Sequence, residues 1–501
     1  MTEFLSGWRA RALPRMAFAV VAIGLSACNT DNLVKVSDPS TLRPADLNNI
    51  GSVPALVNGA FRQFIGGYSG FGLNDAFLSM TAVLSDEAYY GDTFTTRQAA
   101  DQRIMQPTVL GNISDGAFTL LQQARFNARR AYGVVDQYST SLTASADSAT
   151  KAQLRAIEGY TYVTLSEGWC GDVPFSILPD VGDIDPTAIQ GGVGLTTKQM
   201  NDTAVVRFSQ AIANSAANQL AAVGKGRALL NNGQFAAAAA AVAAVPTNYV
   251  FLLQHSQNTA NENNPMYALQ SNGRYGVSNL EGGLTAAGAA IRTDTASSVT
   301  APGGSAEGIA FRGLMDPRVP WEIKPTNGLC FSSSIRCKLN DNYPNFDADV
   351  PLASGVEARL IEAEAALQAG DGVTMMSKLN ALRANSTALL IGLYPGAIPT
   401  NAFKLNGSLF TLAPLADPVD PVARRNLLFT ERALWLYNTG HRLGDLRRLA
   451  RAPYSLATTD VFPSGLFFRG GSYGSDVNYP IPFAEQNNTA FNPAACSTTT
   501  P

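Results

Sequence analysis

The apolar residues of this chain recur mainly at spacings of three and four, the period of a helix with one buried face. The clearest runs are Phe118 to Val135, Leu154 to Leu165, Val356 to Leu367, Met376 to Leu382 and Leu428 to Leu449. Gly440 interrupts the last run, so we expect two helices there rather than one. This pattern predicts a mostly α-helical protein.

Two segments have the pattern of helical hairpins. The first runs from Leu220 to Leu230, turns at Asn231-Asn232-Gly233 and resumes from Phe235 to Val245; the second joins 356–369 to 373–383. The alanines at 236–241 allow a neighbouring helix to approach closely. Such pairs resemble tetratricopeptide-type repeats and must stack to bury their apolar faces, although no strict period is present.

Four stretches between the helices are rich in Gly, Asn, Ser and Pro, and we expect them to be irregular loops: 67–75, 256–309, 322–350 and 386–420. The second is too long to be a plain connector. It carries Tyr267 and Tyr275 among several asparagines. Aromatic faces stack on sugar C–H groups while amides bond hydroxyls, so a sugar-binding loop is one interpretation. Local packing of the tyrosines in a solvated loop is the other, and both stay open.

The N-terminus has the features of an export signal. Three arginines (Arg9, Arg11, Arg15) precede an apolar run from Met16 to Leu25, which is too short for a membrane span. The run ends in Leu25-Ser26-Ala27-Cys28, which looks like the bacterial lipoprotein pattern. We therefore expect residues 1–27 to be removed, Cys28 to be acylated and residues 28–501 to form a single domain. A plain signal peptide with a chance cysteine is the alternative.

Charge and cysteine content narrow the function further. The net charge is −3 and no Lys/Arg cluster is present, which argues against nucleic acid as a partner. Export favours disulfides: Cys330 with Cys337 is the first choice, and Cys170 with Cys496 follows by elimination. The Cys-x6-Cys spacing does not suit a structural zinc site, and with only two histidines we expect neither metal nor cofactor.

No catalytic constellation emerges from the sequence. The segment Gly67-Tyr68-Ser69-Gly70-Phe71 fails the nucleophile-elbow pattern at its last position. No zinc-protease, phosphate-loop or dinucleotide motif is present. The adjacent carboxylates Asp86 and Glu87 leave a glycoside hydrolase as a weak alternative, because neighbouring residues seldom converge on one bond. His441 lies in a helical region, which favours a packing role. The sequence therefore predicts a protein that is not an enzyme.

Two motifs near the C-terminus indicate scaffolding. Arg442, Asp445 and Arg448 are spaced i, i+3 and i+6, so they can pair along a helix. Tyr479-Pro480-Ile481-Pro482 cannot be helical, and we expect an extended strap over the helical body.

Four segments, in order and spacing, resemble the SusD/RagB family of outer-membrane nutrient-binding lipoproteins. They are Leu154-Arg155-Ala156 through Glu167-Gly168-Trp169-Cys170-Gly171-Asp172-Val173-Pro174; Glu357-Ala358-Arg359-Leu360-Ile361-Glu362-Ala363-Glu364-Ala365 with Leu379-Asn380-Ala381-Leu382-Arg383; Glu431-Arg432-Ala433-Leu434 through Gly440-His441-Arg442-Leu443-Gly444-Asp445-Leu446-Arg447-Arg448; and Tyr479-Pro480-Ile481-Pro482 with Glu485, Asn488 and Asn492-Pro493. Ser85-Asp86-Glu87 and Asp316-Pro317-Arg318 are weaker matches. The resemblance covers nearly the whole chain. Ala433-Leu434 and Asn438-Thr439 depart from the family pattern, which puts the ligand class in doubt more than the fold.

The resemblance implies a SusD-like fold of stacked helix pairs with long irregular loops. It also implies a lipid-anchored protein on the outer face of the outer membrane, which captures an oligosaccharide or a peptide and delivers it to a TonB-dependent, SusC-like transporter. Loop context and the family's habits indicate six aromatic side chains as ligand contacts: Tyr89, Tyr90, Phe94, Tyr267, Tyr275 and Trp321. A tetratricopeptide-type adaptor that binds protein partners is the alternative function.

Overall fold

The computed structural model describes residues 49–106, 111–178, 189–278, 309, 311–312, 314, 316–325, 328–333, 337–400, 404–405, 408–409 and 411–501, which lie in one compact unit, Asn48–Pro501. The expected signal peptide and Cys28 lie outside the described residues, as does most of the long loop after Ser278. Within the described ranges, no helix has both the length and the apolar content needed to cross a bilayer.

Helices dominate the described unit, as the apolar spacing predicts. They are α3 (Val53–Tyr68), α4 (Phe77–Leu84), α5 (Thr95–Asp101), α6 (Asp115–Gln137), α7 (Ala144–Gly168), α8 (Thr197–Asn214), α9 (Gln219–Asn231), α10 (Phe235–Val242), α11 (Pro265–Ser271), α12 (Gly355–Gln368), α13 (Gly372–Ala384), α14 (Ser386–Leu393), α15 (Pro421–Trp435), α16 (Arg442–Ala450) and α17 (Thr458–Val461). The break at Gly440 is confirmed: Gly440 lies between α15 and α16 and has a φ of +83°. The prediction that 256–309 and 386–420 are wholly irregular is wrong, because α11 lies in the first segment and α14 in the second. The short apolar sequence of α14 shows no amphipathic period.

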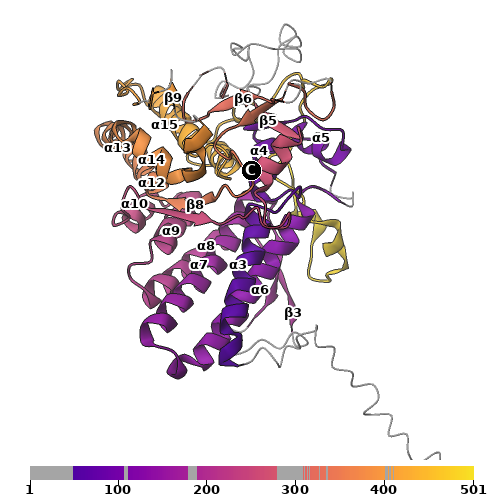
Figure 1. Ribbon diagram of the computed structural model, residues 1–501, viewed down its shortest axis with the longest axis vertical. Helices are drawn as coiled ribbons and strands as arrows, with labels where there is room; N and C mark the ends of the chain where they lie inside the picture. The colour runs from indigo at the N-terminus through magenta and orange to yellow at the C-terminus, as the bar shows by residue number, and fades with distance from the viewer. Residues whose placement is uncertain are drawn as a thin grey trace, which may run out of the picture. The chain divides into compact units, whose positions relative to one another are not determined.

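The helices pack as neighbours in a continuous series. The helix α3 lies against α6, α6 against α7, α7 against α8, and the series continues through α9 and α10 to α12 and α13. Figure 1 shows the long helices α3, α6, α7 and α8 running alongside one another, with α12, α13 and α15 grouped beyond α10. The two predicted hairpins correspond to α9–α10 and α12–α13. Side chains cap several of these helices: Ser354 accepts the Glu357 N–H at 3.1 Å, and Asp371 accepts the Thr374 N–H at 2.9 Å.

The charged residues of the SusD/RagB-like motifs form buried ion pairs between helices. Asp445 accepts from Arg432 at 2.8 Å and from Arg448 at 2.8 Å. Arg448 also donates to Glu364 of α12 at 2.7 Å. A second cluster joins Arg318 to Glu431 at 2.7 Å. The predicted i, i+3 pair of Asp445 and Arg448 is therefore present, but it lies in the core and ties α12 to α15 and α16 rather than lining an exposed face.

The strands that the structure describes form two-stranded antiparallel sheets, and the β8 strand of one of them is buried against α9, α12 and α14. The pairs are β1 (Ala88–Tyr90) with β5 (Tyr275–Val277), β2 (Val173–Ile177) with β3 (Gln190–Leu195), β4 (Val250–Leu253) with β8 (Val350–Ser354), β6 (Trp321–Ile323) with β7 (Lys338–Asn340), and β9 (Lys404–Leu405) with β10 (Ser408–Leu409). In the register of β1 and β5, Tyr90 lies opposite Tyr275, and in that of β6 and β7, Trp321 lies opposite Asn340. These short strands hold the segments that carry the candidate site.

The C-terminal segment is an extended strap across the helical body. Tyr479 donates its N–H to Gly168 at 2.8 Å, and its carbonyl accepts the Cys170 N–H at 2.9 Å. Its buried hydroxyl donates to the Met80 carbonyl at 2.7 Å. The disulfide between Cys170 and Cys496, with Cα atoms 5.2 Å apart, joins the strap to the end of α7.

A candidate ligand-binding platform

Two exposed phenylalanines flank an arginine on the surface formed by α5, β1 and β5. The side chains of Phe94 and Phe331 are each 54% exposed. The guanidinium carbon of Arg274 lies 5.4 Å from the Phe94 ring centre and 5.0 Å from that of Phe331. Arg97 lies 5.3 Å from the Phe94 ring on its own helix α5. We call these four residues the aromatic platform. The strand β1 contacts both α5 and β5, and the last two lie near each other in Figure 1.

Buried carboxylates fix the two arginines of the platform. Asp92, which is fully buried, accepts from Arg97 at 3.3 Å and also accepts from Arg274. Asp75 accepts the Nε–H of Arg97 at 2.7 Å. Each guanidinium thus has a set orientation before a ligand arrives, which reduces the entropy that binding would remove.

The disulfide Cys330–Cys337 holds Phe331 against the sheet. The Phe331 N–H donates to the Gly273 carbonyl at 2.9 Å, and the Ser332 N–H donates to the Gly91 carbonyl at 3.0 Å. A Cβ at Gly91 would lie 2.5 Å from the Cys330 sulfur, so only glycine permits this approach. Gly273 has a φ of +70°, and a Cβ there would lie 3.0 Å from the Cys330 Cα.

Three of the six predicted ligand contacts lie in the interior instead. Tyr89, Tyr90 and Tyr275 are at most 3% exposed. Tyr90 accepts the Phe94 N–H with its hydroxyl, and Tyr275 donates its hydroxyl to Asp75 at 2.6 Å. Tyr89 packs against the Cys330–Cys337 disulfide, and its hydroxyl accepts the Lys338 N–H at 3.2 Å. The pairing of β1 with β5 buries these three rings. They therefore support the platform from beneath, and their burial argues against direct contact with a ligand.

The other three predicted contacts reach the surface in different places. Phe94 lies on the platform. Tyr267 packs edge-on against Phe346, with ring centres 4.8 Å apart, and lines a pocket of about 270 Å³ beside α11. Trp321 is partly buried against the cluster of Phe311 and Tyr437, with Arg312 5.9 Å from its ring. The six residues therefore do not form one site, and ligand contact stays a prediction for these three.

Three platform residues, Arg97, Arg274 and Phe331, were not among the contacts predicted from the sequence. Arginine is common on helix surfaces, and the partners that orient Arg274 lie about 180 residues earlier in the chain, at Asp92. Phe331 follows Cys330 directly and so lies inside the predicted disulfide loop. That position is the sequence feature that could have indicated Phe331 as a surface contact.

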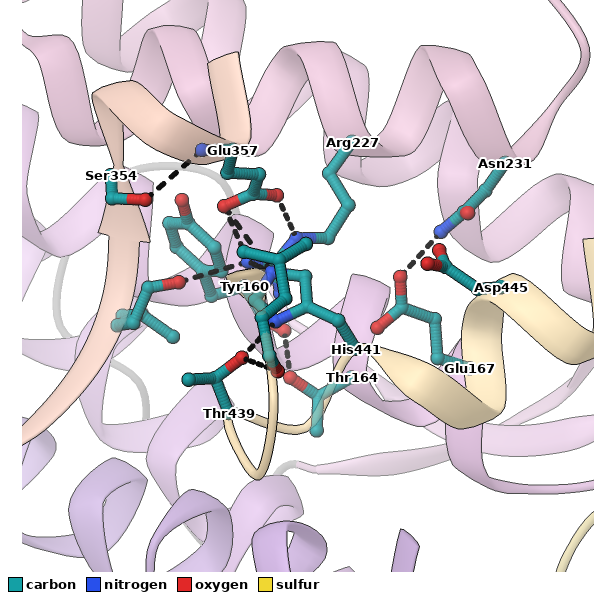
Figure 2. A network of polar contacts seen from close by, with 12 residues as sticks. Tyr160, Thr164, Glu167, Arg227, Asn231, Ser354, Glu357, Thr439, His441 and Asp445 are labelled. Atoms are coloured by element: carbon teal, nitrogen blue, oxygen red, sulfur yellow. Dashed lines mark hydrogen bonds and ion pairs between the residues drawn. The ribbon is translucent and has the colours of Figure 1, made fainter. Parts of the chain in front are cut away.

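The histidine and carboxylates that a catalytic interpretation would use are buried in structural contacts. Figure 2 shows His441 between Arg227 and Thr439: its Nε2 lies 2.5 Å from Arg227 Nη2, and its Nδ1 lies 2.8 Å from Thr439 Oγ1. Asp86 and Glu87 have no exposed surface. Asp86 accepts the Tyr473 hydroxyl, and Glu87 accepts the Asn438 N–H at 2.9 Å. No three His, Cys, Asp or Glu side chains of the described part of the chain are grouped to hold a metal ion.

A buried acid beneath the platform makes stability depend on pH. Asp101, at the end of α5, is fully buried and accepts the Tyr90 N–H at 3.0 Å. Burial raises the pKa of Asp101 to about 7, against the opposing effect of the Tyr90 hydrogen bond. The folded protein therefore holds a proton that the unfolded chain releases near pH 4, and the stability from this group falls as the pH rises from about 4 to about 7.

We expect Asp101→Asn to stabilise the protein at pH 8 but to have little effect at pH 4. The amide keeps the acceptor for Tyr90 and removes the charge. One pKa unit corresponds to about 1.4 kcal/mol, so the gain should grow by about 2–4 kcal/mol over this range. Urea denaturation at pH 4, 6 and 8 measures it. The exposed residue Asp460 provides the control, Asp460→Asn; a gain for Asp101→Asn that does not change with pH would contradict the assignment.

Comparison with known proteins identifies the fold. The sequence matches no family model and no curated protein. Among solved structures, surface glycan-binding protein A from Bacteroides uniformis matches with a TM-score of 0.55 and 15% identity, covering 89% of this chain and 100% of that one. A SusD superfamily protein from Bacteroides fragilis matches with a TM-score of 0.56 and 13% identity, covering 88% and 98%. NanU of B. fragilis matches with a TM-score of 0.53 and 14% identity, covering 90% and 98%.

These likenesses confirm the predicted fold class. The chain has the SusD-like fold of stacked helix pairs with long irregular loops, and the resemblance indicated by its sequence motifs is borne out in three dimensions.

Proposed function

We propose that this protein, with its SusD-like fold, is a cell-surface binding protein that captures an oligosaccharide on the aromatic platform. A lipid on Cys28 would anchor it to the outer membrane, and a partner TonB-dependent transporter would take the captured ligand inward. The glycan-binding names of structural neighbours such as surface glycan-binding protein A of B. uniformis support the ligand class.

The observation that carries the proposal is the arrangement of Phe94, Arg274 and Phe331. Two phenylalanine rings, each about half exposed, lie 5.4 Å and 5.0 Å from a guanidinium held by a buried carboxylate. Exposed aromatic faces stack on the C–H groups of sugar rings, and guanidinium N–H groups donate to hydroxyls. Large apolar side chains on a rigid surface are otherwise costly to leave in water.

We expect the double variant Phe94→Ala/Phe331→Ala to lose most of its affinity for the ligand. Truncating an aromatic residue at the centre of a binding site costs about 2 kcal/mol or more, so the loss should be about 30-fold or greater. Because both rings are exposed, the fold should be nearly unaffected. Affinity gels containing starch, xylan, galactomannan or pectin, followed by calorimetry, measure the change.

Phe94→Trp serves as the conservative counterpart, since it keeps a ring at the same place and should retain binding. Ile177→Ala removes an exposed apolar side chain on β2 and should leave affinity unchanged. If arrays showed binding to peptides but to no glycan, the ligand would be a peptide and not an oligosaccharide. Full affinity in the double variant would show that the platform is not the binding site. Co-purification of a soluble protein partner, without a β-barrel transporter, would favour the alternative function as an adaptor.

A further inference from the structure

The pocket beside α11 shares no lining residue with the aromatic platform. Its volume is about 270 Å³, and its walls come from α11, from β6 and β7, and from the residues that follow each of these two strands. This volume is close to the lower limit of small-ligand pockets, about 300 Å³, so it suits one sugar unit or one side chain. Its polar lining residues include Gln270, Glu322, Lys324, Asn340 and Asp341.

One buried donor in the pocket wall has no protein partner among the described residues. Asn340 is 3% exposed, and its Nδ2 makes no hydrogen bond there. Its amide orientation is fixed, because its Oδ1 accepts the Asn342 N–H at 2.9 Å. Its backbone N–H donates to the Gln270 side chain, and the residue pairs with Trp321 across the hairpin. An unmet buried donor is costly, so a ligand acceptor at this place would be favourable.

Two carboxylates, those of Glu322 and Asp341, line the same pocket. Neither Glu322 nor Asp341 has an ion-pair partner among the described residues, and Lys324 directs its ammonium to the Leu329 carbonyl at 3.5 Å. Burial, and next the nearby Glu322 charge, raise the pKa of Asp341 to about 7. Like charges that share a pocket favour the arrival of a positive group, because that group relieves their repulsion.

We infer that this pocket binds the ammonium group of a ligand between Glu322 and Asp341, while Asn340 donates to a neighbouring ligand oxygen. The ligand is an amino sugar of the captured glycan or a lysine side chain, which share this chemistry. The inference deepens the proposed function but does not require the platform, because the two sites have no residue in common.

Binding should release a proton. Burial and the Glu322 charge favour the protonated form of Asp341. A bound ammonium would stabilise the carboxylate instead, and the proton would pass to the buffer. The titratable groups that line the pocket are Glu322 and Lys324 beside β6, Asp341 and Tyr343 after β7, and Tyr267 of α11. Of these, Asp341 is the group expected to change its charge near pH 6.5.

The test is calorimetry of the mature protein at pH 6.5 in two buffers that differ in ionisation enthalpy. The probes are glucosamine against glucose, and Nα-acetyl-lysine amide against its norleucine counterpart. We expect the amine probe of at least one pair to bind at least tenfold more tightly than its neutral match, with release of up to one proton. The pair that shows this difference identifies the source of the amine.

Variants separate the groups. Asp341→Asn should abolish the proton release and weaken amine binding at least tenfold, while Asn340→Ala should weaken binding without abolishing the release. Thermal unfolding of each variant identifies any that fails to fold, and Glu322→Gln then provides an independent test of the same charge pair. Equal binding of amine and neutral probes, or binding of neither, would overturn the inference.

The double variant Phe94→Ala/Phe331→Ala distinguishes this inference from the proposed function. It should bind the amine probe normally while losing the polysaccharide. If the natural protein binds no polysaccharide but still binds the amine with proton release, the proposed function fails and the pocket stands.

Discussion

Replacing Glu357 by alanine should destabilise the protein by about 3–5 kcal/mol, the usual cost of removing one partner of a buried ion pair. Glu357 receives two hydrogen bonds from Arg227, one from Nε at 2.6 Å and one from Nη2 at 2.9 Å. Both side chains are at most 4% exposed. Without the carboxylate, the Arg227 guanidinium stays in the core beside His441 with an uncompensated charge (Figure 2).

The position of this pair explains the size of the effect. Arg227 comes from α9, Glu357 from α12, and His441 from the turn before α16, so the cluster joins three parts of the helical stack. Arg227 also donates to the Leu352 carbonyl at 2.9 Å, which links β8 to the same centre. Loss of Glu357 thus weakens the packing between repeats and not within a single helix.

Acid should remove the stabilisation that the Glu357–Arg227 ion pair contributes. Burial raises the pKa of Glu357, but the opposing Arg227 and His441 charges dominate and lower it to about 2. The stabilisation is therefore complete above the unfolded pKa of about 4.3 and is lost as the pH falls from there towards 2. The difference between the natural protein and Glu357→Ala should narrow over that range.

Urea denaturation at pH 7 and at pH 3 measures both effects. Lys198→Ala is the matched control: it removes a charge from an exposed i, i+4 pair with Asp202, which should contribute less than about 0.5 kcal/mol. A loss for Glu357→Ala no larger than that of Lys198→Ala would show that the buried pair does not stabilise the fold.

The helical part of the fold was predictable because it depends on local periodicity. The runs at 118–135 and 356–367 have three- and four-residue spacing over several turns, and α6 and α12 cover them. The helix α14 was missed because each of its few turns is apolar on more than one side. The strands were missed because three-residue strands such as β1 and β5 form only through pairing with a segment nearly 200 residues away.

The long separation in sequence between contacting segments also limits how much of the candidate ligand-binding site can be predicted. Loop context predicts that both Phe94 and Tyr90 are ligand contacts. Phe94 does lie on the surface, but Tyr90 is fully buried. The difference is the register of β1 and β5, which places Tyr90 opposite Tyr275 inside the unit. Arg274 becomes part of the platform only when Asp92 and the disulfide loop fold against it, and no local pattern indicates this.

Removal of the Cys170–Cys496 disulfide, as Cys170→Ser/Cys496→Ser, should lower stability far more than removal of Cys330–Cys337. The first bond spans 326 residues and the second spans 7. Chain entropy makes closure of the longer loop worth about 5–6 kcal/mol and that of the shorter about 2 kcal/mol, and native disulfides typically contribute about 2–5 kcal/mol in practice. We therefore expect losses of about 4 kcal/mol and about 1–2 kcal/mol, measured by thermal and urea unfolding.

Removal of the Cys330–Cys337 disulfide should weaken ligand binding more than removal of Cys170–Cys496, the reverse of the order expected for stability. The reason is that the two disulfides hold different parts of the protein. The Cys330–Cys337 bond positions Phe331 on the platform, so Cys330→Ser/Cys337→Ser should weaken glycan binding about tenfold or more with a modest loss of stability. The Cys170–Cys496 bond joins the strap to α7, and it holds none of the four platform residues. At a temperature where both variants are folded, the Cys170–Cys496 variant should bind as the natural protein does. Equal stability losses, or a binding defect confined to the Cys170–Cys496 variant, would contradict this division.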